Sequence, residues 1–197
     1  MLQLIESIQV RNKQLQNVHL HNERLNRSRK DLFFCTLEID IMKVIKIPQW
    51  IENKIYKLRI IYSEKLISHE FIEYIPRKIQ RLTCIFDSDI NYRYKFENRA
   101  CFAHYLSVSM SEDILIVKNN DITDTSFSNI CFFDGVKWLT PGTFLLNGTK
   151  RQLLLGQGII EESEIKFADL KYFKSAKLIN AMLDWDESQP IDISNIC

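Results

Sequence analysis

Hydrophobic and polar residues alternate at strand spacing over much of the first half of the chain. The alternation predicts strands at Leu2–Val10, Tyr56–Tyr62, Leu66–Tyr74 and Gln80–Phe86, and a second short strand after the turn at Arg11–Lys13. Leu25, Leu32 and Phe33 recur at helical spacing among charged residues, which predicts a helix over His21–Phe34. Pro48 is typical of a first helical turn and predicts a short helix over Gln49–Asn53.

The second half of the chain carries different signals. All five glycines follow residue 134, so the tight turns that need glycine concentrate there. Helices are predicted at Asn98–Ser109 and Thr149–Leu155, and Asp169–Asn180 fits either a helix or a strand. The predicted strands are Ile114–Val117, Asn129–Phe133, Val136–Leu139 and Ile159–Ile165, with Asp134-Gly135 as a hairpin turn. A composition change near Asp87–Asp89 predicts a small N-terminal α/β domain over residues 1–86 and a larger domain over 87–197.

Composition narrows the functional classes. A length of 197 residues, 46% hydrophobic residues and 26% charged residues are ordinary for a globular protein with its own core. The net charge of +1 gives no general attraction to nucleic acid, and no apolar stretch has membrane-spanning length. The five cysteines form no CxxC pair, and the start of the chain lacks the pattern of a signal peptide. We therefore expect a cytoplasmic protein with reduced thiols, no nucleic-acid partner and no membrane partner.

Lys95 lies among aromatic residues in the segment Tyr92–Arg99, with no acidic neighbour before Glu97. An apolar environment and the nearby cations Arg93 and Arg99 both favour a neutral amine, which is the nucleophilic form of lysine. The alternative interpretation is a strand lysine whose aliphatic stem passes the aromatic rings and whose ammonium group reaches water. Lys95 is therefore a candidate nucleophile.

Three further sites carry candidate chemistry. Gly148-Thr149-Lys150-Arg151 follows a loop and begins a predicted helix, which suits either anion binding or simple capping by Asn147 or Thr149. Asp124 lies in a polar run between two predicted strands, where it could hold a pyridine nitrogen or form an Asx-turn or helix cap. Arg24 could bind a phosphate or belong to a solvated helix face. The four histidines show no metal-ligand spacing, and no serine lies in a GxSxG elbow, so neither a metal site nor a hydrolase is expected.

Taken together, four motifs resemble those of the class IV aminotransferases, the fold-type IV pyridoxal-phosphate enzymes. The motifs occur in the family's order between about Leu4 and Met182: His21-x-x-Arg24-Leu25-x-x-Ser28, Lys95-x-x-Asn98-Arg99, Ile122-Thr123-Asp124 with Asn129, and Leu146-x-Gly148-Thr149-Lys150-Arg151. Each motif is weak by itself, whereas the ordered set is specific. The resemblance implies an α/β (α+β), two-domain fold like that of D-amino-acid aminotransferase, with the cofactor at the domain interface.

The resemblance also implies roles for individual residues around pyridoxal 5'-phosphate. Lys95 would form the Schiff base, Asp124 and its neighbour Asn129 would serve the ring nitrogen, and Leu146 would pack against the ring. Arg24, Gly148, Thr149 and Lys150 would hold the phosphate. Substrate carboxylates would bind Arg93, Arg99 or Arg151. The residues depart from the family pattern at Asp124, where glutamate is commoner, and at Thr149 and Lys150. The chain is also expected to be a short form without the usual N-terminal hairpin.

Two reactions and one inactive state remain open. Asn98-Arg99 after the lysine favours a 4-amino-4-deoxychorismate lyase, which releases pyruvate and 4-aminobenzoate for folate biosynthesis. The alternative is a branched-chain or D-amino-acid transaminase, and a degenerate, non-catalytic family member is a further alternative. In each enzymatic case we expect a small-molecule amino substrate, and family membership implies a homodimer.

Overall fold

The computed structural model describes residues 2–197 and divides into two compact units. Unit 1 comprises the chain up to Pro76 together with Tyr94–Asn98, and unit 2 comprises Arg77–Arg93 and Arg99–Cys197. Helices and sheets occur in both units, which agrees with the predicted α+β class. The chain thus leaves unit 1 after Pro76, returns to it for five residues around Lys95, and then completes unit 2.

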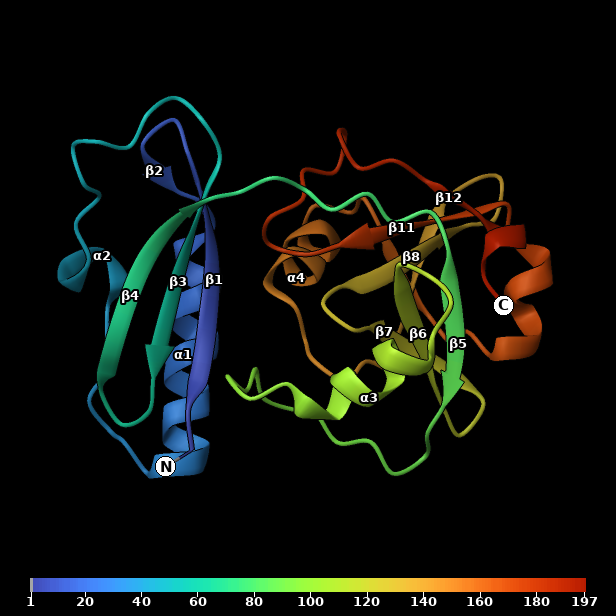
Figure 1. Ribbon diagram of the computed structural model, residues 1–197, viewed down its shortest axis with the longest axis horizontal. Coiled ribbons are helices and arrows are strands. Elements are labelled where there is room, and N and C mark those ends of the chain that lie inside the picture. The colour runs from blue at the N-terminus through green and yellow to red at the C-terminus, as the bar shows by residue number, and fades with distance from the viewer. Residues whose placement is uncertain (1) are drawn as a thin grey trace. The chain divides into compact units, whose positions relative to one another are not determined.

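Unit 1 is a four-stranded sheet with a long helix on one face (Figure 1). The strand order is β2-β1-β3-β4, and every neighbouring pair is antiparallel. Its elements are β1 (Leu4–Arg11), β2 (Gln14–Leu15), α1 (Val18–Phe33), α2 (Ile41–Val44), β3 (Tyr56–Tyr62) and β4 (Leu66–Glu73).

The alternation in β1 and β3 decides which face of the sheet is covered. Leu4, Ile8, Leu58 and Ile60 point to the same side and are fully buried in one cluster with Leu25 of α1. Residues with spacing of two share one face of a strand, so this set forms the core between sheet and helix. Glu6 belongs to the same set of alternating positions, and it is also fully buried.

The segment Tyr94–Asn98 joins unit 1 because its backbone pairs with the start of β1. Ile5 N–H donates to the Lys95 carbonyl over 2.9 Å, and Glu97 N–H donates to the Gln3 carbonyl over 2.9 Å. Tyr94 and Phe96 also pack against the core of unit 1. These contacts place Lys95 in unit 1 and not in the larger C-terminal domain, where the sequence analysis put it.

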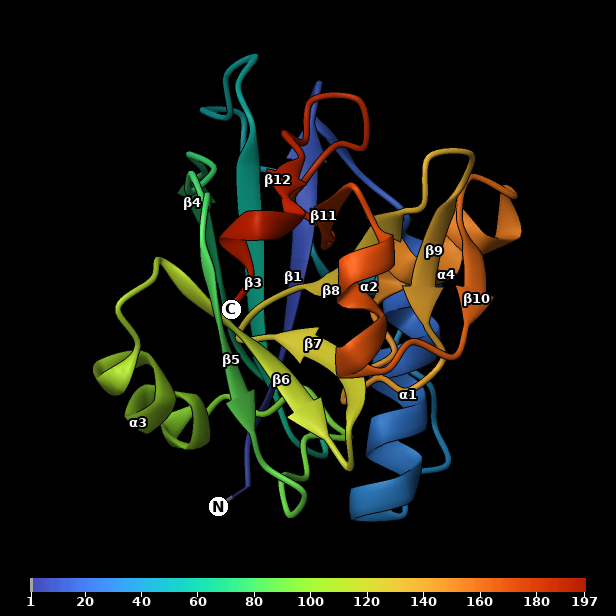
Figure 2. The same cartoon turned by 90° about the vertical axis from the view of Figure 1, so that its right-hand side faces the viewer.

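Unit 2 is built on two sheets (Figure 2). One has the order β5-β6-β7, with β5 and β6 parallel, and the other has the order β10-β9-β8-β11-β12. The strands are β5 (Leu82–Phe86), β6 (Asp113–Lys118), β7 (Asp121–Thr125), β8 (Asn129–Phe133), β9 (Trp138–Pro141), β10 (Glu161–Ser163), β11 (Ser175–Ile179) and β12 (Ile191–Asp192). The helices are α3 (Ala100–Val108), α4 (Thr149–Gly156) and the short 3₁₀ turns η1 (Phe167–Tyr172) and η2 (Ile193–Asn195).

Several sequence expectations need correction. The segment Gln49–Asn53 is a turn, in which Ile51 N–H donates to the Pro48 carbonyl and the Ile51 side chain is buried in the core. The short helix lies earlier, at α2, where the Asp40 side chain accepts a hydrogen bond from Met42 N–H as an N-cap. The chain leaves unit 1 at Pro76, ten residues before the expected boundary at residue 86. The ambiguous segment 169–180 contains both a 3₁₀ turn and strand β11.

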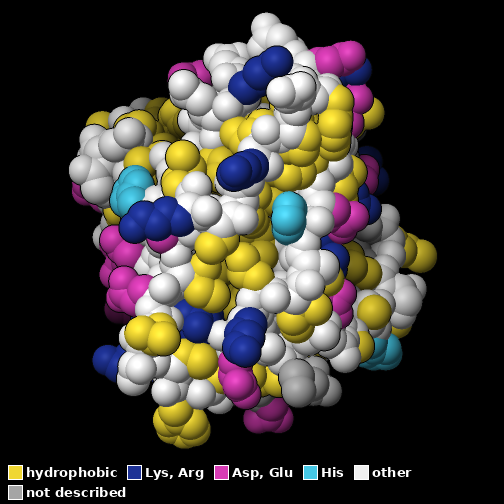
Figure 3. Space-filling view, turned by 90° about the vertical axis from the view of Figure 1, so that its left-hand side faces the viewer, with side chains coloured by type: hydrophobic (Ala, Val, Ile, Leu, Met, Phe, Trp, Pro, Cys, Tyr) yellow, Lys and Arg dark blue, Asp and Glu magenta, His cyan; other side chains and the backbone are white. Residues whose placement is uncertain are grey.

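No helix within residues 2–197 is long and apolar enough to span a bilayer. The face drawn in Figure 3 mixes hydrophobic side chains with scattered lysines, arginines and histidines. Exposed large hydrophobic side chains of unit 1 include Phe34, Leu37 and Trp50.

Candidate active site

Lys95 stands beside a buried ionic cluster in unit 1. Its carbonyl accepts the hydrogen bond of Ile5 N–H, so its backbone lies next to β1 one residue away from Glu6. The Lys95 side chain is partly buried. Its charge lies close enough to His21 of α1 to contribute to lowering the pKa of that histidine. Three segments that are distant in sequence, at Glu6, at His21–Arg24 and at Lys95, therefore meet in one place.

Arg24 is buried, with 5% of its surface exposed, so it does not belong to a solvated helix face. Its Nε donates to Glu6 Oε1 over 2.8 Å, and its Nη2 donates to Glu6 Oε2 over 2.5 Å. Glu6 Oε2 also lies 2.6 Å from His21 Nδ1. One carboxylate thus binds two buried polar side chains of α1.

The charge state of this cluster follows from its partners. Burial alone would raise the pKa of Glu6, but the charge and hydrogen bonds of Arg24, together with His21, lower it to about 2. Burial lowers the pKa of His21, and although Glu6 opposes this effect, the net shift is downward. At neutral pH Glu6 is therefore ionised and His21 is neutral. An ionised carboxylate only accepts hydrogen bonds, so the proton lies on His21 Nδ1.

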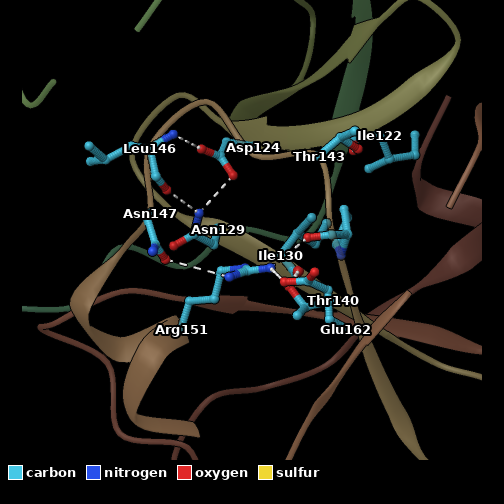
Figure 4. Close-up of polar contacts among 11 residues, drawn as sticks. Ile122, Asp124, Asn129, Ile130, Thr140, Thr143, Leu146, Asn147, Arg151 and Glu162 are labelled. Carbon is cyan, nitrogen blue, oxygen red and sulfur yellow. Dashed lines mark hydrogen bonds and ion pairs between the residues drawn. The ribbon is translucent and has the colours of Figure 1, made fainter. Parts of the chain in front are cut away.

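Asp124 lies inside strand β7, and not in a loop between strands as the sequence analysis placed it. Its Oδ2 accepts from Leu146 N–H over 2.8 Å, and its Oδ1 accepts from Asn129 Nδ2 over 2.7 Å (Figure 4). Oδ2 also accepts from Leu145 N–H over 3.1 Å. Burial raises the pKa of Asp124 to about 6, although these hydrogen bonds oppose the shift. Asp124 is therefore a buried carboxylate that is mostly ionised at pH 7.

The loop that ends at Gly148 is held by Asn129. Asn129 Nδ2 donates both to Asp124 and, over 2.8 Å, to the Leu146 carbonyl. A Cβ atom on Gly148 would lie only 2.0 Å from Asn129 Oδ1, so glycine is required here by close approach. The φ of Gly148 is −68°, which any residue adopts, and no side chain caps the helix. Capping by Asn147 or Thr149 is therefore not what this turn provides.

Helix α4 begins directly after this turn, and its first residues are buried. Thr149 and Lys150 are 3% and 7% exposed. The first N–H groups of a helix have no acceptor within the helix and carry partial positive charge. The Lys150 ammonium adds a full charge, 3.9 Å from Asp184 Oδ1. The start of α4 is thus chemically suited to an anion.

The three arginines suggested for substrate binding have different environments. Arg151 is 2% exposed; it donates to the Pro141 carbonyl and to Glu162, and its guanidinium lies 4.5 Å from the Phe144 ring centroid. A substrate carboxylate would have to displace these partners. Arg99 donates to the Ser126 carbonyl and is partly buried. Arg93 is exposed and lines a cavity of about 370 Å³ together with Lys118, Thr123 and Leu145.

Sequence reasoning missed three polar residues of these clusters. Glu6 appeared only as part of a strand, and His21 only as a motif position. The signal for Glu6 was a lone acid at a core-facing position of an apolar alternation. Asn180 follows β11; its Nδ2 donates to Ser128 Oγ over 2.8 Å, and its Oδ1 accepts from Met182 N–H over 2.8 Å. No local pattern pointed to Asn180.

Comparison with known proteins gives a consistent result. Residues 103–186 match the family model for amino-transferase class IV. An uncharacterized protein of Haemophilus influenzae (strain Rd) is 32% identical over 188 residues, which are 92% of this chain and 98% of that protein. A crystal structure of a Haemophilus somnus 129PT protein, proposed to be a 4-amino-4-deoxychorismate lyase, is 26% identical with a TM-score of 0.82 and covers 92% of this chain and 97% of its own.

A pyridoxal phosphate-bound structure is also among the neighbours. It is a hypothetical aminotransferase from Mycobacterium tuberculosis, with 17% identity and a TM-score of 0.73, matched over 96% of this chain and 80% of its own. At that identity the likeness concerns the fold alone. The fold and family expected from the four motifs are confirmed by these comparisons. The chain belongs to the class IV aminotransferase family.

Proposed function

We propose that this protein is a pyridoxal phosphate-dependent enzyme in which Lys95 is the cofactor lysine. The observation that carries the proposal is the position of Lys95 next to Glu6, His21 and Arg24, all within unit 1. The residues present fit the cofactor's chemistry: an amine, a buried carboxylate, a buried guanidinium and a helix start whose glycine cannot carry a side chain. Bound pyridoxal phosphate supplies an aldehyde for an amine and a protonated pyridine ring that accepts electrons.

In this proposal the residues that would bind the phosphate are Arg24 of unit 1 and, in unit 2, Gly148, Thr149 and Lys150 at the start of α4. A guanidinium matches a phosphate through two parallel hydrogen bonds, and backbone N–H groups add further donors. Thr149 brings a hydroxyl, and Lys150 a second full positive charge. These groups bind and orient the cofactor and take no part in proton transfer.

Asp124 would hold the protonated ring nitrogen, and Leu146 would pack against the ring. Leu145 N–H, Leu146 N–H and Asn129 orient the carboxylate, so it cannot rotate without breaking three hydrogen bonds. A positive ring nitrogen also favours the ionised form of Asp124. Aspartate is shorter than the glutamate common in the family, and the backbone N–H groups of Leu145 and Leu146 donate directly to its carboxylate.

Lys95 Nζ would carry the proton that moves during the reaction. Once an amino substrate has replaced it, the amine can accept a proton at Nζ and return it. Lys95 is partly buried beside the aromatic residues Tyr94 and Phe96, and the loss of solvation there favours the neutral amine over the ammonium form. Exposed Arg93 and partly buried Arg99 are the better candidates for a substrate carboxylate, since Arg151 is engaged inside unit 2.

For the reaction, we favour a 4-amino-4-deoxychorismate lyase that releases pyruvate and the folate precursor 4-aminobenzoate. Support comes from Asn98-Arg99 after Lys95 and from the 26% identical H. somnus protein proposed to have this activity. A class IV amino-acid transaminase is the second candidate, because an aminotransferase fold from Mesorhizobium loti matches 100% of both chains at 19% identity. A homodimer and a cytoplasmic location accompany the proposal as expectations from the family and from five free cysteines.

Borohydride reduction with added cofactor, followed by peptide mapping, tests the proposal. The label should lie on Lys95 and should be lost in Lys95→Ala, with the circular dichroism spectrum retained. Lys57→Ala, which removes a partly buried lysine of β3, is the matched control and should keep the label. Absence of label, or a label on another lysine, would reject the assignment.

The two reactions are separated by their products. Release of pyruvate and 4-aminobenzoate from 4-amino-4-deoxychorismate, without any amino acceptor, supports the lyase. Formation of 2-oxoglutarate from glutamate, with amino transfer to a second 2-oxo acid, supports the transaminase instead. A protein that carries the label on Lys95 but turns over neither substrate would be a non-catalytic family member.

A further inference from the structure

Glu6 is an unusual residue for its position. It lies on β1 between Leu4 and Ile8, both with 0% exposure, and is itself 0% exposed. A buried carboxylate is costly unless its charge is paired and its lone pairs are satisfied. Glu6 meets this condition through three hydrogen bonds, two to Arg24 and one to His21. An apolar residue here would avoid the cost, so the acid calls for an explanation beyond packing.

The geometry of the pair sets the orientation of Arg24. A guanidinium presents two edges that can meet an acceptor in bidentate fashion, one formed by Nε with one Nη atom and the other by the two Nη atoms. Glu6 occupies the edge of Nε and Nη2. Because the group is planar, the direction of the second edge is then determined.

The same carboxylate sets the state of His21. Glu6 Oε2 accepts the proton of Nδ1, which leaves Nε2 as the acceptor nitrogen of a neutral ring. Glu6 also balances the charge of Arg24 within the core. The trio Glu6, His21 and Arg24 is therefore electrically neutral and has one defined arrangement of protons.

We propose that Glu6 is a positioning residue that acts through Arg24: it takes the side-on edge of the guanidinium and so presents the end-on edge to the phosphate of the cofactor. This inference rests on the proposed function, because the phosphate belongs to it. A purely structural ion pair, which only ties α1 to β1, is the competing explanation. Both explanations expect Glu6 variants to be less stable. Only positioning expects a loss that is selective for the phosphate group.

Pyridoxamine 5'-phosphate and pyridoxamine are the probes, because they differ only in the phosphate and neither carries an aldehyde that could condense with Lys95. Their dissociation constants are measured by titration calorimetry on the full chain. In Glu6→Gln, affinity for pyridoxamine 5'-phosphate should fall on the order of tenfold, the effect of losing a charge-assisted hydrogen bond. Affinity for pyridoxamine should change by less than about threefold.

Ile8→Val is the matched control, since Ile8 lies on the same strand and face and is fully buried. It weakens the core without altering Glu6, so the ratio of the two dissociation constants should stay at the wild-type value. If Glu6→Gln does not fold, Glu6→Asp decides the question. Asp keeps the charge but is one methylene shorter, so it cannot hold both guanidinium nitrogens. Affinity for pyridoxamine 5'-phosphate should therefore again fall relative to affinity for pyridoxamine.

An equal loss for both probes, or an unchanged ratio in the Glu6 variants, would overturn the positioning role. The wild-type protein should also show His21 as the neutral Nδ1–H tautomer in a long-range proton–nitrogen correlation spectrum at pH 7. A cationic ring or the other tautomer would contradict the arrangement around Glu6. Labelling of Lys95 in the wild type tests the proposed function separately. If Lys95 is labelled but the ratio of the two dissociation constants is unchanged in the Glu6 variants, only the positioning role of Glu6 is refuted.

Discussion

Replacing Gly148 by alanine tests how the loop before α4 holds the buried Asp124. The new Cβ would lie 2.0 Å from Asn129 Oδ1, whereas ordinary van der Waals contact begins near 3.4 Å. Backbone strain does not enter, because the φ of −68° suits alanine. The atom that must move is therefore in the side chain of Asn129, or the loop itself must shift.

The expected cost follows from the hydrogen bonds that Asn129 Nδ2 makes. One goes to the Asp124 carboxylate at 2.7 Å and the other to the Leu146 carbonyl at 2.8 Å. A hydrogen bond to a charged group contributes about 1.5–3 kcal/mol and a neutral one about 1 kcal/mol, so displacing Asn129 should lower the free energy of unfolding by about 2–4 kcal/mol. Affinity for pyridoxal phosphate should fall as well, since Asp124 loses an orienting partner.

Gly156→Ala is the control at the other end of the same helix. No atom lies within 4 Å of a Cβ built there, and alanine is the better helix former, so this variant should be more stable by about 0.5–1 kcal/mol. Urea unfolding followed by circular dichroism measures both changes. The double variant Gly148→Ala/Asn129→Ala should lose less than the sum of the single variants, because removing Asn129 makes room for the Cβ. Gly148→Ala within about 0.5 kcal/mol of wild type, or strict additivity, would refute this reasoning.

Three further predictions follow from the buried carboxylates. For Asp124, whose pKa is raised to about 6, cofactor affinity should rise as pH increases through 6, and Asp124→Asn should remove this dependence in a binding titration. Asp113 is fully buried, and burial raises its pKa although hydrogen bonds from Ser126 and Thr125 oppose the shift. Stability should therefore fall as pH rises above the ordinary value of 3.8, and Asp113→Asn should flatten the urea midpoint between pH 4 and pH 7. Glu6 has a lowered pKa of about 2, so its contribution is present above pH 4.5 and is lost as pH falls toward 2; Glu6→Gln should be less acid-sensitive than wild type in thermal unfolding, and an identical acid profile would contradict this.

Most secondary structure could be read from local pattern. The strands at residues 56–62, 66–73 and 129–133 and helix α1 lie where the periodicity placed them, to within a few residues. These elements are amphipathic, so the spacing of their apolar residues already records which face is buried. No helix forms at Gln49–Asn53 because no apolar face follows Pro48, whereas the Asp40 side chain caps the short helix α2 nearby.

The ordered motifs in the sequence determined the family, and the alternation of residues determined the strands and the core faces. Tertiary structure decided which of the chemical groups meet. Lys95 pairs with β1, Glu6 binds Arg24 across 18 positions, and Asp124 receives N–H groups from a loop 21 and 22 residues away. Such contacts depend on strand register and on the path of loops through space, and these are set by the packing of whole elements. A local sequence pattern indicates the secondary structure that each segment prefers, but it does not indicate which distant segment will contact it.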